Sequence, residues 1–302
     1  MKTKPTVTIG IPALNEGNNI GCLLSDILKQ QTLNYTISKI IVSSDGSTDN
    51  TIAVARAIKF RHLEVIDNKD RRGVSARQNQ IISHTNSDIL VILNADIRIL
   101  DPEFVSRLIQ PIIDKKADLT SPSVREFSPR TFIESTLNIA MRLKTVLFET
   151  WRSGNNGYMC HGTARAFSKS FFSKLSFTAD VGEDMYSYLE CLRLRKVFKY
   201  VKDTAIWYRN PDNVSDQLKQ STRFIKCHAD FSAIDKYRSI TGELHIPALV
   251  IVLALVRSLP VIVLHPIQTL AYLILTIYMR FRIKYLPFIG DLWLTSSTKK
   301  AV

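Results

Sequence analysis

Residues 40–49 read Ile-Ile-Val-Ser-Ser-Asp-Gly-Ser-Thr-Asp, an apolar run that ends in a polar turn. The apolar part belongs to a strand predicted over residues 37–42, and Asp45-Gly46 is a turn signal. A helix is predicted directly afterwards, from about Thr48 to Lys59. A strand, a polar turn at its carboxyl end and a helix make up the first part of a βαβ unit.

The same alternation recurs through the first hundred residues. Strands are predicted over residues 6–11, 37–42, 63–66 and 89–93, and helices over 18–30, 48–59 and 74–83. This order predicts an α/β fold whose sheet is mostly parallel and has helices on both faces. In such sheets ligands bind at the carboxyl ends of the strands.

The segment from residue 102 to 237 is less regular. Helices are predicted over 102–114, 129–151, 182–195 and 215–237, and extended segments over 117–127, 159–167 and 197–207. The segment 159–167 is expected to be a strand that crosses under the ligand site.

The composition is that of a globular protein, with 45% hydrophobic and 22% charged residues in a chain of 302. Forty Lys and Arg against 27 Asp and Glu give a net charge of +13, which predicts an anionic partner. Most of the surplus lies in the second half, and the basic residues of 251–302 flank the most apolar stretch, which favours a membrane surface. Because no arginine-rich run or RNA-binding signature accompanies it, no nucleic-acid partner is expected.

Residues 246–279 contain one formal charge, Arg257, and three prolines. This stretch is short for two membrane crossings and too broken for one, so a short or re-entrant hairpin turning near residues 257–260 is expected. Basic residues on both sides place both ends on the cytoplasmic face. A buried helical pair, covering a domain or a dimer interface, is the alternative. The amino terminus has no apolar signal segment, so the chain is expected to start in the cytosol.

Polar clusters follow the predicted strands of the first hundred residues. They are residues 12–16 (Pro-Ala-Leu-Asn-Glu), 45–49 (Asp-Gly-Ser-Thr-Asp), 71–79 (Arg-Arg-Gly-Val-Ser-Ala-Arg-Gln-Asn) and 94–96 (Asn-Ala-Asp). Any one of them is equally consistent with a turn or a helix cap. Because the carboxyl ends of parallel strands meet at one edge of the sheet, the four clusters are expected to converge.

Residues 9–16 and 40–49 resemble two motifs of glycosyltransferase family 2, inverting enzymes with the GT-A fold, which is Rossmann-like with a mixed, mostly parallel sheet. The resemblance extends over about residues 6–225. It implies a catalytic domain at 1–242, with a nucleotide-sugar half at 1–100 and an acceptor half at 101–242. A membrane-associated helical hairpin and basic tail are expected to follow at 243–302.

The resemblance implies a donor site at the strand ends. Asp45 would accept hydrogen bonds from the nucleotide base, and Arg77 would lie over the nucleotide or its phosphates. A surface ion pair with a nearby acid is the alternative for Arg77. The other implied donor-binding residues are Pro12, Ala13, Glu16, Ser44, Gly46, Asn94, Ala95 and Asp96.

Residues 94–96 occupy the place of the family's Asp-x-Asp metal motif. The resemblance implies that Asp96 holds Mg²⁺ or Mn²⁺, which neutralises the diphosphate leaving group. Asn94 departs from the family's pattern, since its amide brings no charge.

Glu183-Asp184 opens a predicted helix, where an acidic pair is also favoured by the helix dipole. Its similarity to the family's Glu-Asp motif implies that Asp184 is the general base that deprotonates the acceptor hydroxyl. Inverting transfer needs one such base, on the face of the sugar opposite the leaving nucleotide.

Two further segments resemble motifs of membrane polysaccharide synthases. Residues 159–163 (Met-Cys-His-Gly-Thr) are similar to an acceptor loop with His161 inserted, and His161 is also compatible with a metal ligand or an interior histidine. Residues 220–224 (Gln-Ser-Thr-Arg-Phe) look like Gln-x-x-Arg-Trp, with an ordinary amphipathic helix as the alternative. The implied acceptor or diphosphate contacts are His161, Gly162, Glu183, Gln220, Arg223 and Phe224.

These features predict an inverting glycosyltransferase that moves a sugar from a nucleotide-diphosphate sugar, a UDP-sugar most commonly in this family, to a membrane-proximal acceptor such as a lipid-linked one. The setting expected is glycan or polysaccharide assembly at the cytoplasmic face of the cell membrane, with the apolar segment as anchor. Single-sugar addition is expected, because this segment is too short for the channel of a processive synthase. The alternatives are a polyprenyl-phosphate glycosyltransferase and a catalytically inactive binding protein, the latter favoured only by Asn94.

Overall fold

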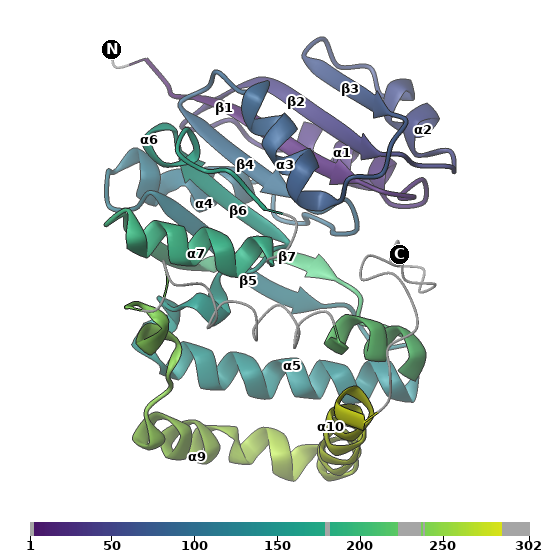
Figure 1. The fold of residues 1–302 in the computed structure, drawn as a ribbon, viewed down its shortest axis with the longest axis vertical. Helices are drawn as coiled ribbons and strands as arrows, with labels where there is room; N and C mark the ends of the chain where they lie inside the picture. The colour runs from purple at the N-terminus through teal and green to yellow at the C-terminus, as the bar shows by residue number, and fades with distance from the viewer. Residues whose placement is uncertain (1–2, 179–181, 223–236, 238, 286–302) are drawn as a thin grey trace. The chain divides into compact units, whose positions relative to one another are not determined.

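The computed structural model describes residues 3–178, 182–222, 237 and 239–285 (Figure 1). These residues form two compact units. The sheet unit comprises the residues up to Arg125 together with Gly157–Tyr208. The helical unit comprises Glu126–Asn156 and the described residues from Arg209 onwards. The predicted domain boundary at residue 242 stays a prediction.

The sheet unit is built on a sheet with the strand order β3-β2-β1-β4-β6-β5-β7. The strands are β1 (Thr6–Ala13), β2 (Thr36–Asp45), β3 (Leu63–Asn68), β4 (Ile89–Leu93), β5 (Leu119–Glu126), β6 (Ala164–Ser168) and β7 (Phe198–Tyr208). The first four strands in the chain pair in parallel, and β6 runs antiparallel to both β4 and β5. The predicted α/β fold with a mixed, mostly parallel sheet is confirmed.

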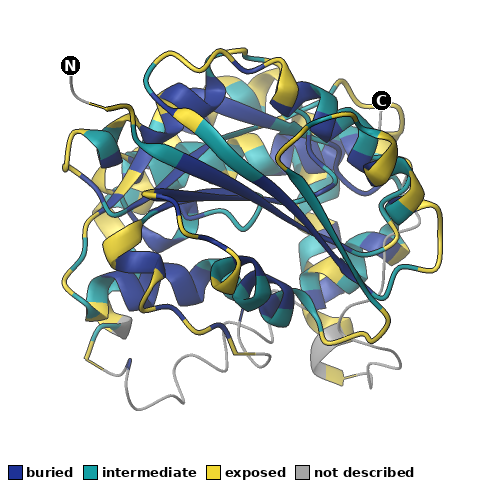
Figure 2. Ribbon diagram, turned by 90° about the horizontal axis from the view of Figure 1, so that it is seen from above, coloured by how far each residue is buried: buried dark blue, intermediate teal, exposed yellow. Residues whose placement is uncertain are grey.

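Helices cover both faces of this sheet, as predicted (Figure 1). The helices of the sheet unit are α1 (Ile20–Leu28), α2 (Thr51–Ala57), α3 (Val74–Ser83), α4 (Phe104–Ile113), α6 (Lys169–Phe172) and α7 (Glu183–Arg193), with a 3₁₀ turn η2 (Gly157–Met159). Alternate residues of β1, such as Ile9 and Ile11, join α1 and α4 in the main core. Gly10 points to the other face, towards Ile81 of α3. Figure 2 shows the resulting buried centre of the sheet.

The segment 159–167 is not one strand, contrary to the prediction. Strand β6 begins only at Ala164, and residues 160–163 form a loop. This loop is held by a hydrogen bond from the backbone N–H of His161 to Ser121 Oγ (3.1 Å). The glycine at 162 lets the loop pass close to the start of α7, which a regular strand would not do.

The helical unit is organised around one long helix. Its elements are α5 (Phe132–Thr150), the 3₁₀ turns η1 (Arg152–Gly154) and η4 (Thr241–Leu244), a helical segment at residues 214–222, α9 (Ala248–Leu264) and α10 (Pro266–Tyr285). Both α9 and α10 pack against α5. The predicted helix at 215–237 is observed up to residue 222, and residues 223–236 lie outside the described part of the chain.

The apolar tail does not turn where the sequence predicted. Helix α9 continues through Arg257 and Pro260, and the chain breaks at His265 instead. His265 precedes Pro266, and a residue before proline is pushed out of the helical region. Pro266 then starts α10, where its missing N–H costs nothing.

One helical stretch among the described residues, Gly242–Leu264, is long and apolar enough to cross a membrane by length and composition alone. Its mean hydropathy over the most apolar window is 2.5, and only 11% of that window is buried.

Candidate active site

Asp45, at the carboxyl end of β2, is held by a dense set of donors. Its Oδ1 accepts hydrogen bonds from Arg77 Nε (2.7 Å) and from the backbone N–H of Arg72 (2.8 Å), and its Oδ2 accepts one from Gly73 N–H (2.9 Å). A carboxylate offers about four acceptor positions, so room for about one further donor remains. The structure thus fixes the orientation of Asp45 before any ligand arrives.

Arg77 lies on α3 and is 4% exposed, so its ion pair with Asp45 is buried rather than on the surface. Its Nη2 also donates to the backbone carbonyl of Asp70 (2.6 Å) and to Asp70 Oδ1 (3.2 Å). Hydrogen bonds from Arg72 and Arg77 lower the pKa of Asp70. Asp70, which the sequence analysis did not select, therefore helps to hold Arg77 in place.

The loops after β1 and β2 are tied together at the same edge of the sheet. Pro12 and Ala13 pair in register with Ser43 and Ser44. Beyond the strands, the N–H of Glu16 donates to Thr51 Oγ1 (2.7 Å). The predicted convergence of these two polar clusters is confirmed.

Asp49 reinforces this connection, because its Oδ2 accepts from the N–H of Gly17 (3.0 Å). Partial burial alone would raise the pKa of Asp49, but the hydrogen bonds from Thr51 and Gly17 together lower it. The turn itself needs Gly46, whose φ of +73° is strained for other residues and which passes close to the backbone of Asp70. Ser44, fully buried, donates its hydroxyl to Ser47 Oγ (2.9 Å).

The turn Asn94-Ala95-Asp96 follows β4 and lies beside the loop of residues 160–163. The N–H of Asn94 donates to the carbonyl of Thr163 (2.9 Å), while Ala95 is buried and Asp96 is half-buried. The predicted metal-binding turn and the loop containing His161 and Gly162 are therefore neighbours.

Gly162 brings this loop against the two carboxylates that open α7. A Cβ placed on Gly162 would lie 3.3 Å from Glu183 Oε1 and 3.6 Å from Asp184 Oδ2. Asp184 is half-buried, and its Oδ1 accepts from the N–H of Met185 (2.7 Å). Glu183, Asp184 and the loop thus form one side of the candidate site.

His161 is neutral at physiological pH in this setting. Burial lowers the pKa of His161 to about 4, and the negative charge of Asp184 opposes that shift only in part. Burial likewise raises the pKa of the neighbouring Cys160 thiol to about 12, so this thiol is not a nucleophile. A neutral imidazole can still donate or accept a hydrogen bond.

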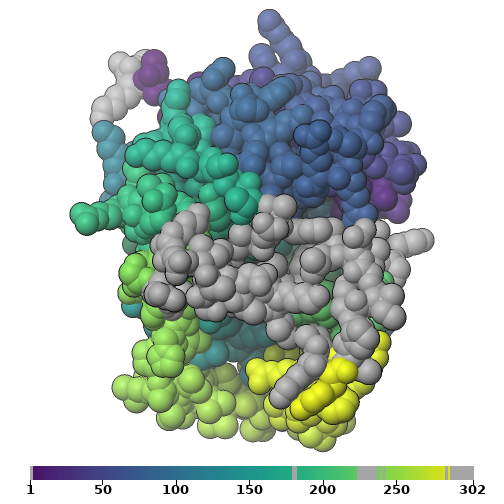
Figure 3. Space-filling model, viewed as in Figure 1, coloured from purple at the N-terminus to yellow at the C-terminus, as the bar shows by residue number. Residues whose placement is uncertain are grey.

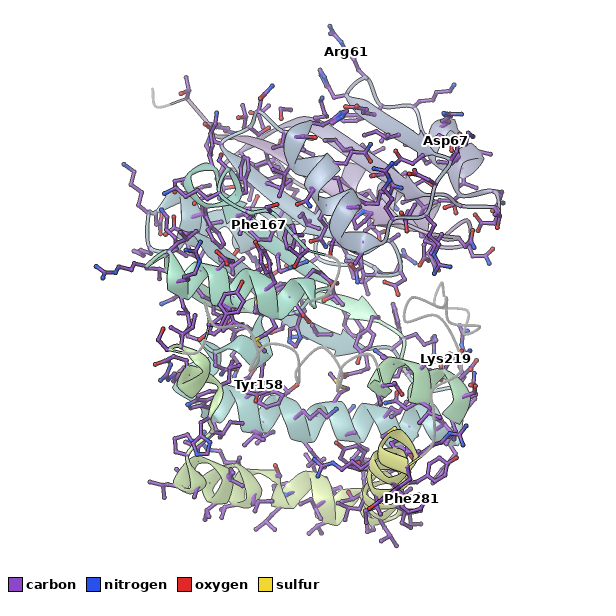
Figure 4. The ribbon with its side chains drawn as sticks, in the orientation of Figure 1. Arg61, Asp67, Tyr158, Phe167, Lys219 and Phe281 are labelled. Atoms are coloured by element: carbon purple, nitrogen blue, oxygen red, sulfur yellow. The ribbon has the colours of Figure 1, made fainter. Side chains whose placement is uncertain are left out.

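Arg165 is a residue that the sequence analysis missed. It is fully buried on β6, and its Nη1 donates to the carbonyl of Glu183 and to Ser187 Oγ, both at 2.6 Å. Its Nε and Nη2 have no hydrogen-bond partner in the described part of the chain, and its guanidinium lies near the rings of Phe167 and Phe177. Figure 4 labels Phe167 on β6. Only the fold reveals this contact, because the sequence places Arg165 within a strand pattern.

Asp96 is a single half-buried carboxylate at the predicted metal position. Among the residues that the structure describes, no three His, Cys, Asp or Glu side chains gather as a ready-made metal site. Mg²⁺ commonly binds through one or two carboxylates and the phosphates of the substrate, so a single carboxylate at Asp96 suits that arrangement.

The predicted Gln-x-x-Arg-aromatic element is only partly described. Gln220 is exposed on the helical segment 214–222 of the helical unit. Arg223 and Phe224 lie outside the described residues.

The fold is shared with solved glycosyltransferases. A mannosyltransferase from Pyrobaculum calidifontis, in complex with GDP-Man and Mn²⁺, superposes with a TM-score of 0.62 at 17% identity, covering 94% of this chain and 88% of that chain. Glucosyl-3-phosphoglycerate synthase from Mycobacterium tuberculosis, in complex with Mn²⁺, UDP and glucosyl-3-phosphoglycerate, superposes with a TM-score of 0.52 at 20% identity, covering 74% and 80%. The fold is therefore of the GT-A glycosyltransferase class, as predicted.

The family model described as "Glycosyl transferase family 2" matches residues 8–176, which is more than half of the chain. The chain belongs to glycosyl transferase family 2. It is also similar to 4,4'-diaponeurosporenoate glycosyltransferase of Staphylococcus aureus, with 36% identity over 106 residues in strain bovine RF122 and over 105 in strain MRSA252. The matched stretch is 34% of this chain and only 27% of those relatives. The predictions of the family and of a glycosyltransferase enzyme are confirmed at this level.

Proposed function

We propose that this protein is an inverting glycosyltransferase that transfers one sugar from a nucleotide-diphosphate sugar, a UDP-sugar in the first instance, to a membrane-proximal acceptor. The observation that carries the proposal is the position of Asp184. It opens α7 directly beside Gly162, in a loop whose Thr163 carbonyl is bonded to the metal-binding turn at Asn94. A base and a candidate diphosphate site on neighbouring loops are what an in-line displacement requires.

The donor side is preorganised in this proposal. Asp45, locked by Arg77 and two backbone N–H groups, uses its remaining acceptor position for the nucleotide base. Pro12, Ala13 and Glu16 line the same edge. Asp96, with Asn94 beside it, would hold Mg²⁺ or Mn²⁺, which when bound neutralises the leaving diphosphate.

On the acceptor side, Asp184 takes the proton of the acceptor hydroxyl. The oxygen then bonds to the anomeric carbon while the bond from that carbon to the diphosphate oxygen breaks, so the configuration inverts. Glu183, His161 and Gly162 border the space for the acceptor, and neutral His161 offers a hydrogen bond without competing for the proton. Gln220, Arg223 and Phe224 are proposed as further acceptor or diphosphate contacts.

The acceptor is proposed to be lipid-linked, within glycan or polysaccharide assembly at the cytoplasmic face of the membrane. The exposed apolar surfaces of α9 and α10 support this location, since they would hold the enzyme where such acceptors reside. A polyprenyl phosphate is the alternative acceptor, favoured by the basic second half of the chain.

The test is nucleotide release by the detergent-purified chain with UDP-, GDP- and dTDP-sugars, Mg²⁺ or Mn²⁺, and with or without a membrane-lipid extract. Asp184→Asn should lower turnover by about 10²–10⁴-fold while nucleotide binding persists. The matched control is Asp203→Asn, an exposed acid on β7 outside the site, which should keep full activity. Nucleotide binding without release from any donor or acceptor would favour the inactive binding protein, and equal release by Asp184→Asn would remove Asp184 from its role.

A further inference from the structure

The helical unit exposes large apolar side chains, whereas side chains of the same kind are mostly buried in the sheet unit. On α9, Leu255, Val263 and Leu264 are 57%, 72% and 74% exposed, and on α10, Ile267 and Ile277 are 68% and 69% exposed. Figure 3 shows atoms of both helices at the surface. A helix that is apolar all round is normally buried in protein or in lipid, so these faces require a partner.

Helix α9 meets α5 through a narrow seam of small residues. Ala254 and Ser258, one turn apart, are the buried residues of α9. Arg257 lies on the same side, because its Nη1 donates to Thr150 Oγ1 at the end of α5 (3.1 Å). The other residues of α9 are mostly apolar and exposed, with Val250, Val261 and Ile262 half-buried. The charge of Arg257 therefore lies towards α5, and the outer face of α9 carries none.

Helix α10 has the same two-sided character. Leu275 and Met279 pack on Leu137 of α5, and Lys144 of α5 lies 5.9 Å from the ring centroid of Tyr272. The opposite side is apolar and ends in exposed aromatic residues, of which Phe281 is labelled in Figure 4. Arg280 and Arg282 flank that aromatic residue. Basic and aromatic residues at the end of an apolar face are typical of a membrane interface.

The packing on α5 argues against a crossing by α9, although its composition permits one. The helical stretch Gly242–Leu264 is long and apolar enough to cross, so the charges around it decide the geometry. Arg257 lies near the middle of α9, and Arg142 and Lys144 are exposed on α5, along which α9 packs. A crossing would bring these three charges into the hydrocarbon, where each is strongly unfavourable.

We infer that α9 and α10 lie in the plane of the membrane and insert their outer faces into one leaflet rich in anionic phospholipid. This inference rests on the proposed membrane association and specifies its geometry. Arg257, Arg280 and Arg282 then reach the phosphate headgroups, while α5 stays on the aqueous side. The net charge of +13 complements such a surface.

The experiment measures the depth of Leu255, which a crossing would place near the bilayer centre and an in-plane helix near the headgroups. A fluorophore is attached to the full-length Leu255→Cys variant, which is bound to vesicles of phosphatidylcholine and phosphatidylserine. Nitroxide lipids labelled near the headgroup should quench it more strongly than lipids labelled near the chain ends. The unaltered chain corrects for native cysteines, and Lys199→Cys, exposed in the sheet unit, should not be quenched.

Stronger quenching by the deep nitroxide would overturn the in-plane geometry while leaving membrane association intact. Failure to float with vesicles, together with a soluble monodisperse chain without detergent, would overturn both that geometry and the proposed anchoring. Nucleotide release, measured separately, tests the transferase proposal independently. The double variant Arg280→Ser/Arg282→Ser should lose vesicle binding, and the unaltered chain should lose binding to vesicles without phosphatidylserine. Either loss would support the contact between these arginines and anionic headgroups.

Discussion

The sheet unit and the helical unit distribute apolar and polar side chains in opposite ways. The sheet unit buries most of its Val, Ile and Leu side chains and leaves most of its charges at the surface. The helical unit buries a polar group that contains Glu134, Asn138, Arg209 and Asn210, and exposes the apolar sides of α9 and α10. The arrangement in the sheet unit is that of a protein surrounded by water. The exposed apolar faces of the helical unit require an apolar partner.

The largest difference in unfolding free energy is expected between substitutions of two buried arginines, one in each unit. Arg209 of the helical unit pairs with buried Glu134 (3.3 Å), so Arg209→Met leaves an unpaired buried carboxylate and should cost about 3–5 kcal/mol of unfolding free energy. Arg165 of the sheet unit has no anionic hydrogen-bond partner among the described residues, so Arg165→Met should be close to neutral or stabilising. Urea unfolding in one detergent measures both.

Arg165→Met should nevertheless lower kcat by up to about a hundredfold, because the carbonyl of Glu183 loses the donor that positions the start of α7. The donor KM should be unchanged, and Arg165→Lys should recover part of kcat. Lys199→Met, the same kind of change at an exposed position, should affect neither quantity. A parallel fall in stability and kcat would assign Arg165 a purely structural role.

The second comparison uses two leucines. Leu23 of α1 is fully buried, so Leu23→Ala should cost about 2–5 kcal/mol through lost burial and a cavity. Leu255→Ala on the exposed side of α9 should change stability in detergent by no more than about 0.5 kcal/mol. Denaturation midpoints test this, and equal costs at the two sites would show that protein, rather than lipid or detergent, covers α9.

The third comparison uses two glycines. A Cβ on Gly10 would lie 2.3 Å from Ile81 Cγ2, so Gly10→Ala should cost about 1–3 kcal/mol by overpacking β1 against α3. Among the described residues, no atom beyond its chain neighbours lies within 4 Å of a Cβ on Gly242, and Gly242→Ala should stay within about 0.5 kcal/mol of the unaltered chain. Thermal unfolding of the two variants provides the measurement. A tolerated Gly10→Ala would mean that the helix and strand separate easily.

The smallest effect concerns pH and His161. Because the pKa of His161 falls from 6.5 to about 4 on folding, the unfolded chain takes up the proton first as the pH drops. The contribution of neutral His161 is therefore complete above about pH 6.5 and is lost between there and about pH 4. Allowing for its partial exposure, lowering the pH from 7.5 to 5 should cost about 1–2 kcal/mol, and His161→Gln should remove this part of the loss. If the stability of the unaltered chain and of His161→Gln depended on pH identically, a lowered pKa of His161 in the folded chain would be contradicted.

The sequence predicts local features where a pattern repeats within a few residues. Strand β4 lies at the predicted residues, and the polar clusters after β1 and β2 converge because parallel strands place their carboxyl ends together. The prediction failed where distant contacts override a local pattern. The loop before β6 is an example, because it contains Gly162 and is held by the hydrogen bond from His161 N–H to Ser121 Oγ.

By itself, therefore, the sequence determined the α/β class, the alternation of strands and helices along the first hundred residues and the candidate residues at the strand ends, since period and turn chemistry are local properties. Only the tertiary structure decided that Arg77 is buried against Asp45, that Arg165 supports Glu183, and that the break in the tail falls at His265. It also decided that α9 rests on a helix with exposed charges. These are contacts between residues far apart in the chain, and no local pattern encodes which partner each side chain meets.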